Sequence, residues 1–456
     1  MTKSNNGLRD TAVYEIPGSR RGIQKQRDVS ADISAAEKMF RAVIIFVIVI
    51  SLGFPGKYTR LLGGGSEKLF EYSAFILQIA VMLLSGAVDG VSGIRLIDLK
   101  RRYGIVYFTA AVFFIDSMLV TAYPSEQFIS CFRFTVTIFF ALWLADRYEA
   151  CELLRLICTA QLIFVVLTLM YAAAFPGAVF VREQGDHDFA GIMATKNNAA
   201  AEFAFGMLMF IAWFKMMRRS KKSIPGIYII GFVISAVMLL LCNAKGAIIC
   251  FLLPAAYLIF FEGRSGERFR LPLGLIYVAG SVGFIIIALT ILPLFKPLLD
   301  LLGKDVTLTG RTILWRQIIN VMTDGNTFTG YGFGMFWRNR EAVAMIHAVF
   351  RQNSFFGMMS TGAHNVILEY WLNVGLIGVG CYFAAFLISF SHPEQISGDD
   401  YMICAAYILW FMMHGLTERS MSTYEYQTLF LFAAMGLGCN RPYKAVKHTR
   451  RKILIQ

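Results

Sequence analysis

The chain has 456 residues, of which 57% are hydrophobic and only 16% are charged. A soluble domain carries about a quarter charged residues, and the mean hydropathy here is +0.58. With repeated apolar runs long enough to cross a bilayer, this composition predicts a polytopic helical membrane protein and excludes an ordinary soluble enzyme. The net charge of +13 would suggest nucleic acid in a soluble protein. Here we attribute it to membrane orientation and expect no nucleic-acid partner.

The two ends of the chain are polar and basic. Residues 1–36 lack the apolar core of a cleavable signal peptide, so we expect a disordered cytoplasmic tail. Residues 441–456 form a second basic tail, which we also place in the cytoplasm. The eight cysteines lie in or beside apolar segments and include no Cys-x-x-Cys pair, which predicts neither a disulfide framework nor a zinc site.

Between these tails the apolar runs predict an all-α protein with about twelve transmembrane helices. Nine of them occupy residues 37–295 and three occupy residues 364–440. The predicted helices span residues 37–54, 69–88, 103–122, 127–145, 153–176, 197–214, 224–242, 246–261, 271–295, 364–390, 400–416 and 424–440. If the N-terminus is placed in the cytoplasm, most Lys and Arg residues fall in the cytoplasmic segments. This distribution predicts a protein of the bacterial inner membrane with both termini in the cytoplasm.

Residues 296–363 lie between the ninth and tenth helices and are too long for a mere connector, so we expect a periplasmic, helical, catalytic loop. Apolar residues at three- and four-residue spacings predict a helix over residues 308–323, capped by Thr307 or Thr309. Arg311 then lies in the first turn, where a cation opposes the helix dipole unless an anion binds there too. The alternative is a surface Arg on an amphipathic helix at the membrane interface.

Glycines at positions 330, 332 and 334 alternate with Tyr331 and Phe333. The spacing is not that of a nucleotide-binding loop, and it predicts a tight turn on the membrane surface that lets the backbone approach a substrate. His364 stands at the outer end of the next apolar helix, followed by Asn365 and Glu369. An imidazole there either takes a proton from a sugar hydroxyl near neutral pH or is an ordinary interfacial side chain.

The ordered set TGRTxLW, GYGFG and AHNxxLE followed by GLIG resembles the O-antigen ligase and Wzy-type polysaccharide polymerase superfamily. Two upstream segments fit the resemblance. KNNAAAEFAFG looks like the family's KN-containing segment, and CNAKGAIICFLLP stands where many members carry an SRxA-type sequence. This chain has Lys245 where the family usually has Arg, which keeps the cation but loses the bidentate fork.

The resemblance implies a membrane glycosyltransferase that transfers glycan from undecaprenyl pyrophosphate at the periplasmic face, with no nucleotide sugar, metal or other cofactor. A polymerase passes the growing glycan to another lipid-linked repeat unit, whereas a ligase passes it to lipid A–core. We favour an exopolysaccharide polymerase, because the KNN and TGRTxLW segments resemble such polymerases more than lipopolysaccharide ligases. Membrane lipids and a chain-length regulator are the further partners expected. The rival of another class is a lipid-linked sugar transporter or flippase, which needs no such folded loop.

If the protein is such a glycosyltransferase, we expect Arg311 and Lys245 to stabilise the diphosphate leaving group and His364 to act as the general base of an inverting displacement. The remaining expected contacts with substrate come from side chains on several segments. They are Lys196, Asn197, Arg133, Thr312, Asn365, Glu369 and Arg419.

Several of these residues have a plainer interpretation. Lys196 and Asn197 open the sixth predicted helix, where capping and interface contacts are common. Arg133 lies about 9 Å inside the fourth helix, at a depth where it can form a structural ion pair with Asp116 of the third. The alternative is that Arg133 reaches the diphosphate. In the last outer loop, Glu418 and Arg419 are expected to face the same cavity or one another.

Overall fold

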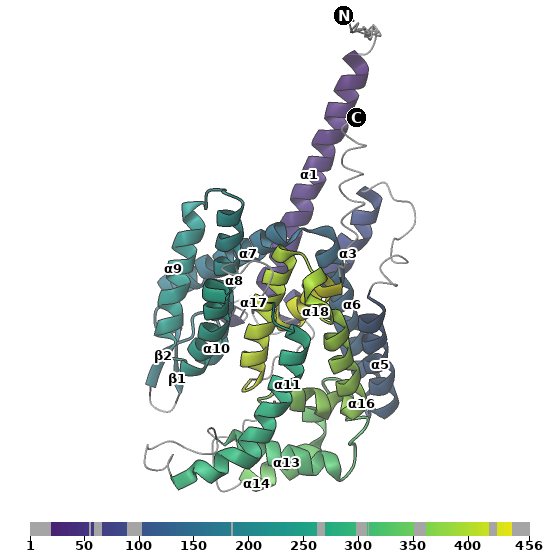
Figure 1. The fold of residues 1–456 in the computed structure, drawn as a ribbon, viewed down its shortest axis with the longest axis vertical. Coiled ribbons are helices and arrows are strands. Elements are labelled where there is room, and N and C mark those ends of the chain that lie inside the picture. The colour runs from purple at the N-terminus through teal and green to yellow at the C-terminus, as the bar shows by residue number, and fades with distance from the viewer. Residues whose placement is uncertain are drawn as a thin grey trace, which may run out of the picture.

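The protein is described from a computed structural model, in which helices dominate (Figure 1). The described residues are 20–53, 56–58, 66–88, 103–183, 186–261, 270–297, 308, 310–350, 362–418 and 426–439. The fold class is that of an all-α membrane protein, with one short β-hairpin that the sequence did not predict. The hairpin pairs β1 (Phe180–Glu183) with β2 (Asp186–Phe189) in antiparallel register.

Each of the twelve predicted helices is matched by a helix at the same position in the chain. They are α1 (Arg20–Ser51), α3 (Ser66–Val88), α5 (Gly104–Val120), α6 (Pro124–Arg147), α7 (Ala150–Ala174), α8 (Lys196–Arg219), α9 (Gly226–Leu241), α10 (Lys245–Ala256) continued by η2 (Tyr257–Phe261), α11 (Leu273–Ile286) continued by η4 (Ile287–Ile291) and η5 (Leu292–Phe295), α16 (Val366–Ser389), α17 (Gly398–Gly415) and α18 (Tyr426–Cys439). In the described part, five helical runs are long and apolar enough to cross a membrane: α6, α7, α8, Leu273–Phe295 and α16. The number of spans and their orientation remain predictions.

Helix α1 is longer than the sequence predicted. It begins at Arg20, so part of the segment expected to be a disordered tail is helical, while residues 1–19 lie outside the described residues. Helix propagation adds one hydrogen bond for each residue ordered, so an apolar helix can extend into a polar neighbouring segment. The second predicted tail, residues 441–456, lies entirely outside the described residues.

The core of the bundle is aromatic. Tyr277 of α11 stacks on Phe386 of α16 with ring centroids 4.0 Å apart, and its hydroxyl lies 2.8 Å from the hydroxyl of Tyr382. The hydroxyls therefore pair with each other where water is excluded. Around this core α6 packs on α18, α5 packs on α16, and α10 packs on both α8 and α17.

The long loop between α11 and α16 has a small hydrophobic core of its own. Helix α13 (Arg311–Thr323), the turn η6 (Phe336–Arg338) and helix α14 (Arg340–Phe350) pack against the start of α16. Leu314, Trp315 and Ile318 of α13 are buried, as the apolar spacing predicted. The predicted threonine cap is wrong, because Gly310 is the N-cap residue and its φ of 86° is one that glycine adopts easily.

The glycine segment inserts into a break in α16. At Val374 and Gly375 the backbone of α16 is not helical, and the φ of Gly375 is 59°. The backbone of the loop fills the gap, since the Tyr331 N–H donates to the Leu372 carbonyl at 2.9 Å and the Leu376 N–H donates to the Thr327 carbonyl at 3.0 Å.

The expected turn on the membrane surface is therefore wrong. Phe333 is buried, and its ring lies 4.3 Å from that of Phe134 on α6. The backbone of Phe333 also bonds within the protein. Its N–H donates to the Ser117 hydroxyl of α5 at 2.9 Å, and its carbonyl accepts from Gln127 Nε2 of α6 at 3.0 Å. A sequence pattern of glycines and aromatics cannot distinguish this buried segment from a surface turn, because its burial depends on contacts with the break in α16, which lies about 40 residues away in the chain.

Candidate active site

Arg311 is the first residue of α13, at the end of the bundle where the long loop packs (Figure 1). Its Nη2 donates to Glu418 Oε1 at 2.7 Å, and its side chain is 19% exposed. The buried Nε of Arg311 has no hydrogen-bond partner within the described part of the chain. The guanidinium therefore retains donor capacity beyond its contact with Glu418.

His364 lies two residues before α16 and contacts the other oxygen of the same carboxylate. Its Nδ1 is 3.2 Å from Glu418 Oε2. Its φ is 48°, in the left-handed region that residues other than glycine rarely occupy. Such strain persists only when the surrounding structure holds the backbone, and it concentrates at functional sites.

Contacts on both sides of His364 hold that conformation. The N–H of Ala363 donates to Glu369 Oε2 at 2.7 Å, and the Ala363 carbonyl accepts from Trp315 Nε1 at 2.9 Å. On the other side Asn365 is the N-cap of α16, and its Oδ1 accepts from the backbone N–H groups of residues 367 and 368. The imidazole is thus fixed by the packing of α13 against the start of α16.

Glu418 joins Arg311 and His364 into a triad that we call the Glu418 site. Burial acts to raise the pKa of Glu418, but the contact with His364 and the charge of Arg311 hold that pKa below its ordinary value. Glu418 is therefore an ionised carboxylate at neutral pH. An ionised carboxylate only accepts hydrogen bonds, so it favours the tautomer of His364 with the proton on Nδ1 and a lone pair on Nε2.

Two residues predicted to contact substrate also support this site through contacts within the protein. Asn365 is fully buried, and its Nδ2 donates to the Leu416 carbonyl at 3.1 Å, which ties the end of α17 to the start of α16. Glu369 is buried and its Oε1 accepts from Trp337 Nε1 at 2.9 Å. Thr312 is also buried, one residue after Arg311. The geometry of Asn365 and Glu369 favours positioning, and their contact with substrate stays a prediction.

A second polar cluster includes the start of α8. Lys196 Nζ donates to Asp188 Oδ2 at 2.5 Å, and Asn243 Nδ2 donates to Asp188 Oδ1 at 3.3 Å. The contact with Lys196 lowers the pKa of Asp188. Lys245 opens α10 and Asn197 lies in the first turn of α8, and both side chains are exposed.

This cluster lies at the same end of the molecule as the Glu418 site. Successive helices from α8 to α11 run in opposite directions, so the N-terminal ends of α8 and α10 face the end that carries α13 (Figure 1). Helix α10 also packs on α17, whose C-terminal end leads to Glu418. The basic groups at these helix starts therefore border the same side of the bundle, although none of them contacts the Glu418 site in the described residues.

The predicted ion pair between Asp116 and Arg133 does not form. The guanidinium of Arg133 lies over the ring of Tyr72 on α3, 5.4 Å from its centroid. Thr137, one turn further along α6, also faces α3. Asp116 lies on the buried face of α5, and its Oδ2 has no hydrogen-bond partner among the described residues. The two helices are neighbours, as expected, but the rotation of α6 about its axis turns Arg133 away from α5.

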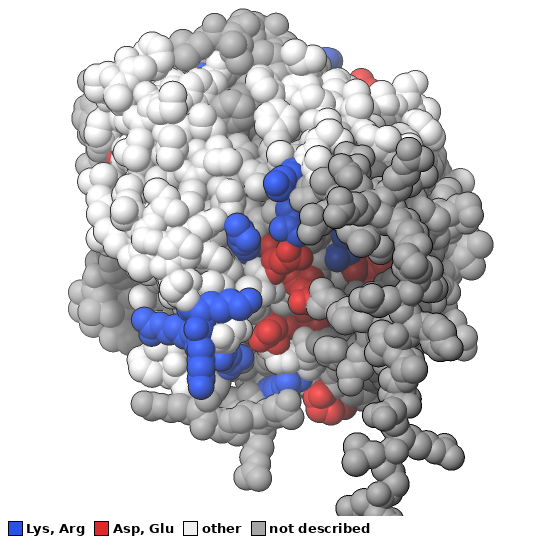
Figure 2. All heavy atoms as spheres, turned by 90° about the horizontal axis from the view of Figure 1, so that it is seen from above, with Lys and Arg blue, Asp and Glu red and all other residues white. Residues whose placement is uncertain are grey.

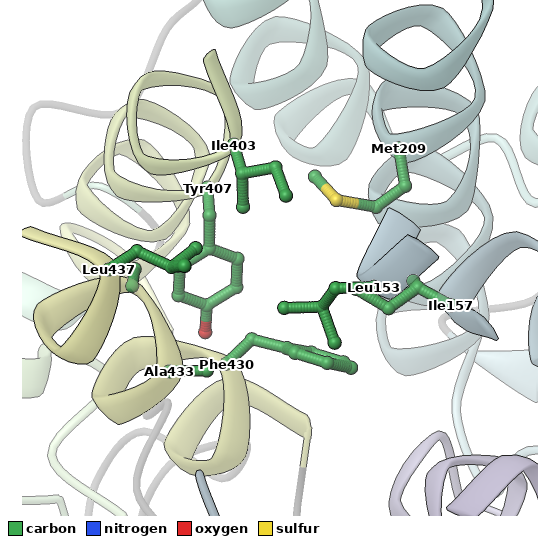
Figure 3. A pocket seen from close by; sticks show the side chains of 9 residues that line it. Leu153, Ile157, Met209, Ile403, Tyr407, Phe430, Ala433 and Leu437 are labelled. Carbon is green, nitrogen blue, oxygen red and sulfur yellow. The ribbon is translucent and has the colours of Figure 1, made fainter. Parts of the chain in front are cut away.

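Arg419 lies outside the described residues. In the part of the chain that is described, no group of three or more His, Cys, Asp or Glu side chains could hold a metal ion, and metal independence stays a prediction. An apolar cavity between α7, α8, α17 and α18 has a volume of only about 10 Å³ and is too small for a sugar (Figure 3).

The sequence did not identify Glu418 as the partner of Arg311 and His364. It follows Arg311 by 107 residues and His364 by 54, and no motif connects them. The only local signal was an acidic residue in an otherwise short outer loop. Folding of α17 against α16 is what brings this loop to the start of α13.

A protein-family model described as O-antigen ligase matches residues 230–383. The match covers about a third of the chain and includes Lys245, Arg311 and His364, but it ends before Glu418. No curated protein matches the chain. The match supports an enzyme of the membrane glycan ligase or polymerase type. Over residues 230–383 the match confirms the resemblance seen in the sequence to the O-antigen ligase family.

Proposed function

We propose that the protein polymerises undecaprenyl-pyrophosphate-linked oligosaccharide repeat units into a surface polysaccharide, at the periplasmic face of a bacterial inner membrane. The observation that carries this proposal is the Glu418 site, which holds a guanidinium and an imidazole on one carboxylate. A guanidinium suits a diphosphate, and a neutral imidazole suits the removal of a proton from a sugar hydroxyl.

The reaction proposed is a single displacement at the anomeric carbon of the donor. The acceptor hydroxyl oxygen forms the new bond to this carbon, its proton passes to His364 Nε2, and the bond to the diphosphate oxygen breaks. The bonding electron pair leaves with the diphosphate. Arg311 stabilises the negative charge that develops there, exchanging part of its contact with Glu418 for the phosphate oxygens. Attack opposite the leaving group inverts the configuration.

The other basic residues extend the proposed donor site along the end of the bundle. Lys245, exposed at the start of α10, supplies a second cation for the diphosphate without the fork geometry of Arg. Lys196 already contacts Asp188, so its proposed role is to set the charge of the site rather than to bind phosphate alone. No step of this proposal requires a metal.

The alternative within the same class is an O-antigen ligase that transfers the glycan to lipid A–core. A deletion strain tests the choice by its surface glycan. Loss of long chains with single repeats retained supports the polymerase, whereas bare lipid A–core with intact polymer on the carrier overturns it in favour of the ligase. A dependence of chain length on a second membrane protein would identify the expected regulator.

The alternative of another class is a transporter or flippase of lipid-linked sugars. Purified protein in detergent, given lipid-linked repeat units and no ion gradient, separates the two. Formation of longer glycan there supports the enzyme. Unchanged substrate from protein that retains its fold, together with gradient-dependent movement of the lipid in vesicles, would overturn it.

A further inference from the structure

A polar pocket lies at the opposite end of the bundle from the Glu418 site. It has a volume of about 190 Å³ and is lined by side chains of α1, α7 and α9 and of the turn before α7. Its charged lining residues are Arg41, Glu152 and Arg155. Figure 2, which views the molecule from this end, shows basic and acidic side chains gathered across it.

The carboxylates near this pocket already have cationic partners. Arg41 donates to Glu37 at 3.1 Å and to Glu152 at 2.5 Å, and Arg147 donates to Glu37 at 2.8 Å. Arg155 is exposed and has no ion-pair partner among the described residues. Among the charged side chains that line the pocket, Arg41 pairs with Glu152, so Arg155 leaves the lining with a surplus positive charge.

Hydroxyl groups complete the polar lining. Thr159 lies one turn after Arg155 on α7, and its hydroxyl is 3.0 Å from that of Tyr228 on α9. Tyr148 lines the pocket too. A ligand of this pocket is therefore anionic and accepts hydrogen bonds, as a phosphate group does.

An apolar track leads away from the pocket along α7. Ile163, Val166 and Met170 follow Thr159 at helical spacing on one side of α7, and all three are exposed. An exposed apolar stripe that continues directly from a cationic pocket matches the two parts of a phospholipid, the acyl chain and the headgroup. Free phosphate would fill the pocket alone and would make no use of this stripe.

We propose that the pocket around Arg155 binds the phosphate of an anionic phospholipid, with an acyl chain lying along the exposed stripe of α7. The lipid joins α1, α7 and α9 at the end of the bundle remote from the Glu418 site. This inference does not depend on the proposed glycan transfer. A bound lipid stabilises the folded state by mass action, which makes thermal unfolding a suitable measure.

The test uses the full-length protein purified in detergent, with its unfolding temperature measured as dioleoyl-phosphatidylglycerol, dioleoyl-phosphatidylcholine or inorganic phosphate is added. We expect phosphatidylglycerol to raise the unfolding temperature more than phosphatidylcholine does. In Arg155→Gln the affinity for phosphatidylglycerol falls about tenfold, as expected for the loss of one charge-assisted hydrogen bond. Arg218→Gln removes an equal charge from the same end of the protein outside the pocket and keeps the wild-type response.

Three outcomes would overturn the proposal. Equal stabilisation by both lipids means that the headgroup charge is not recognised. Equal responses of the two variants mean that general surface charge, rather than the pocket, attracts the lipid. Stabilisation by inorganic phosphate that matches phosphatidylglycerol and is lost in Arg155→Gln means that the pocket binds the free ion.

Discussion

Two carboxylates at opposite ends of the molecule are each shared by several partners, yet the two networks differ in kind. Glu37 accepts from Arg41, Arg147 and the Tyr148 hydroxyl, all of which keep their protonation near neutral pH. Glu418 is shared between Arg311 and an imidazole. Only the second network contains an imidazole, the side chain that most often serves as a general acid or base. A shared carboxylate therefore marks a candidate reactive site when one of its partners is a general acid or base.

The backbone reinforces this difference. Arg41 is one helical turn from Glu37 within α1, so that contact forms wherever the helix forms. His364 instead sits in a left-handed conformation that tertiary contacts must hold. The contact between Arg41 and Glu37 thus forms within one helix, whereas the Glu418 site includes a strained backbone at His364 that tertiary contacts hold in place.

The largest effect is expected from His364→Ala. Loss of a general base reduces glycan transfer by a factor on the order of 10²–10⁴. The measurement is the rate of chain extension by purified protein. The matched control is His392→Ala, which is expected to keep full activity. His392 is an exposed histidine just before the turn η7 (Pro393–Gln395), which follows the C-terminal end of α16. Wild-type transfer by His364→Ala would remove the distinction drawn between the two networks.

Arg311→Ala comes next, with transfer lowered by a factor on the order of 10²–10³, because electrostatic stabilisation of the leaving group is lost. Arg311→Lys keeps the charge but not the fork, so part of the activity returns. The same assay measures both variants. Equal activity of the Ala and Lys variants would show that charge at this position is not what the reaction uses.

Glu418→Gln has a smaller effect on rate, about tenfold, because His364 and Arg311 lose a negatively charged hydrogen-bond acceptor. It also changes the dependence of stability on pH. Since the pKa of Glu418 is lowered in the fold, its stabilising contribution is present above about pH 4.3, the ordinary value for Glu, and is lost as the pH falls through the folded pKa.

Thermal unfolding at a series of pH values tests this point. The wild-type protein is expected to lose more stability than Glu418→Gln on acidification below about pH 4.3. Parallel curves for the two proteins would mean that the ionised carboxylate does not stabilise the site.

Glu37→Gln should have the smallest effect. Its side chain is partly exposed, and ion pairs of this kind contribute about 1 kcal/mol or less. We expect unchanged glycan transfer and a slightly lower unfolding temperature. A loss of transfer as large as that of Glu418→Gln would show that the two networks are not separate in function.

The sequence alone determined the positions of the helices and the order of the motifs. Apolar length and spacing are local properties, and a backbone in lipid must satisfy its hydrogen bonds within each segment, so all twelve predicted helices appear at the expected positions. Arg311 in the first turn of α13 and His364 just before α16 follow from the same local patterns.

Only the tertiary structure decided how these pieces meet. The rotation of α6 turned Arg133 toward Tyr72 and left Asp116 unpaired with it. The break in α16 received the glycine segment, because its unpaired backbone groups needed partners that only a distant loop supplies. The place of Glu418 at the centre of the site also depends on tertiary structure. Its contact with Arg311, 107 residues away, depends on how α13, α16 and α17 pack, and no local spacing encodes it.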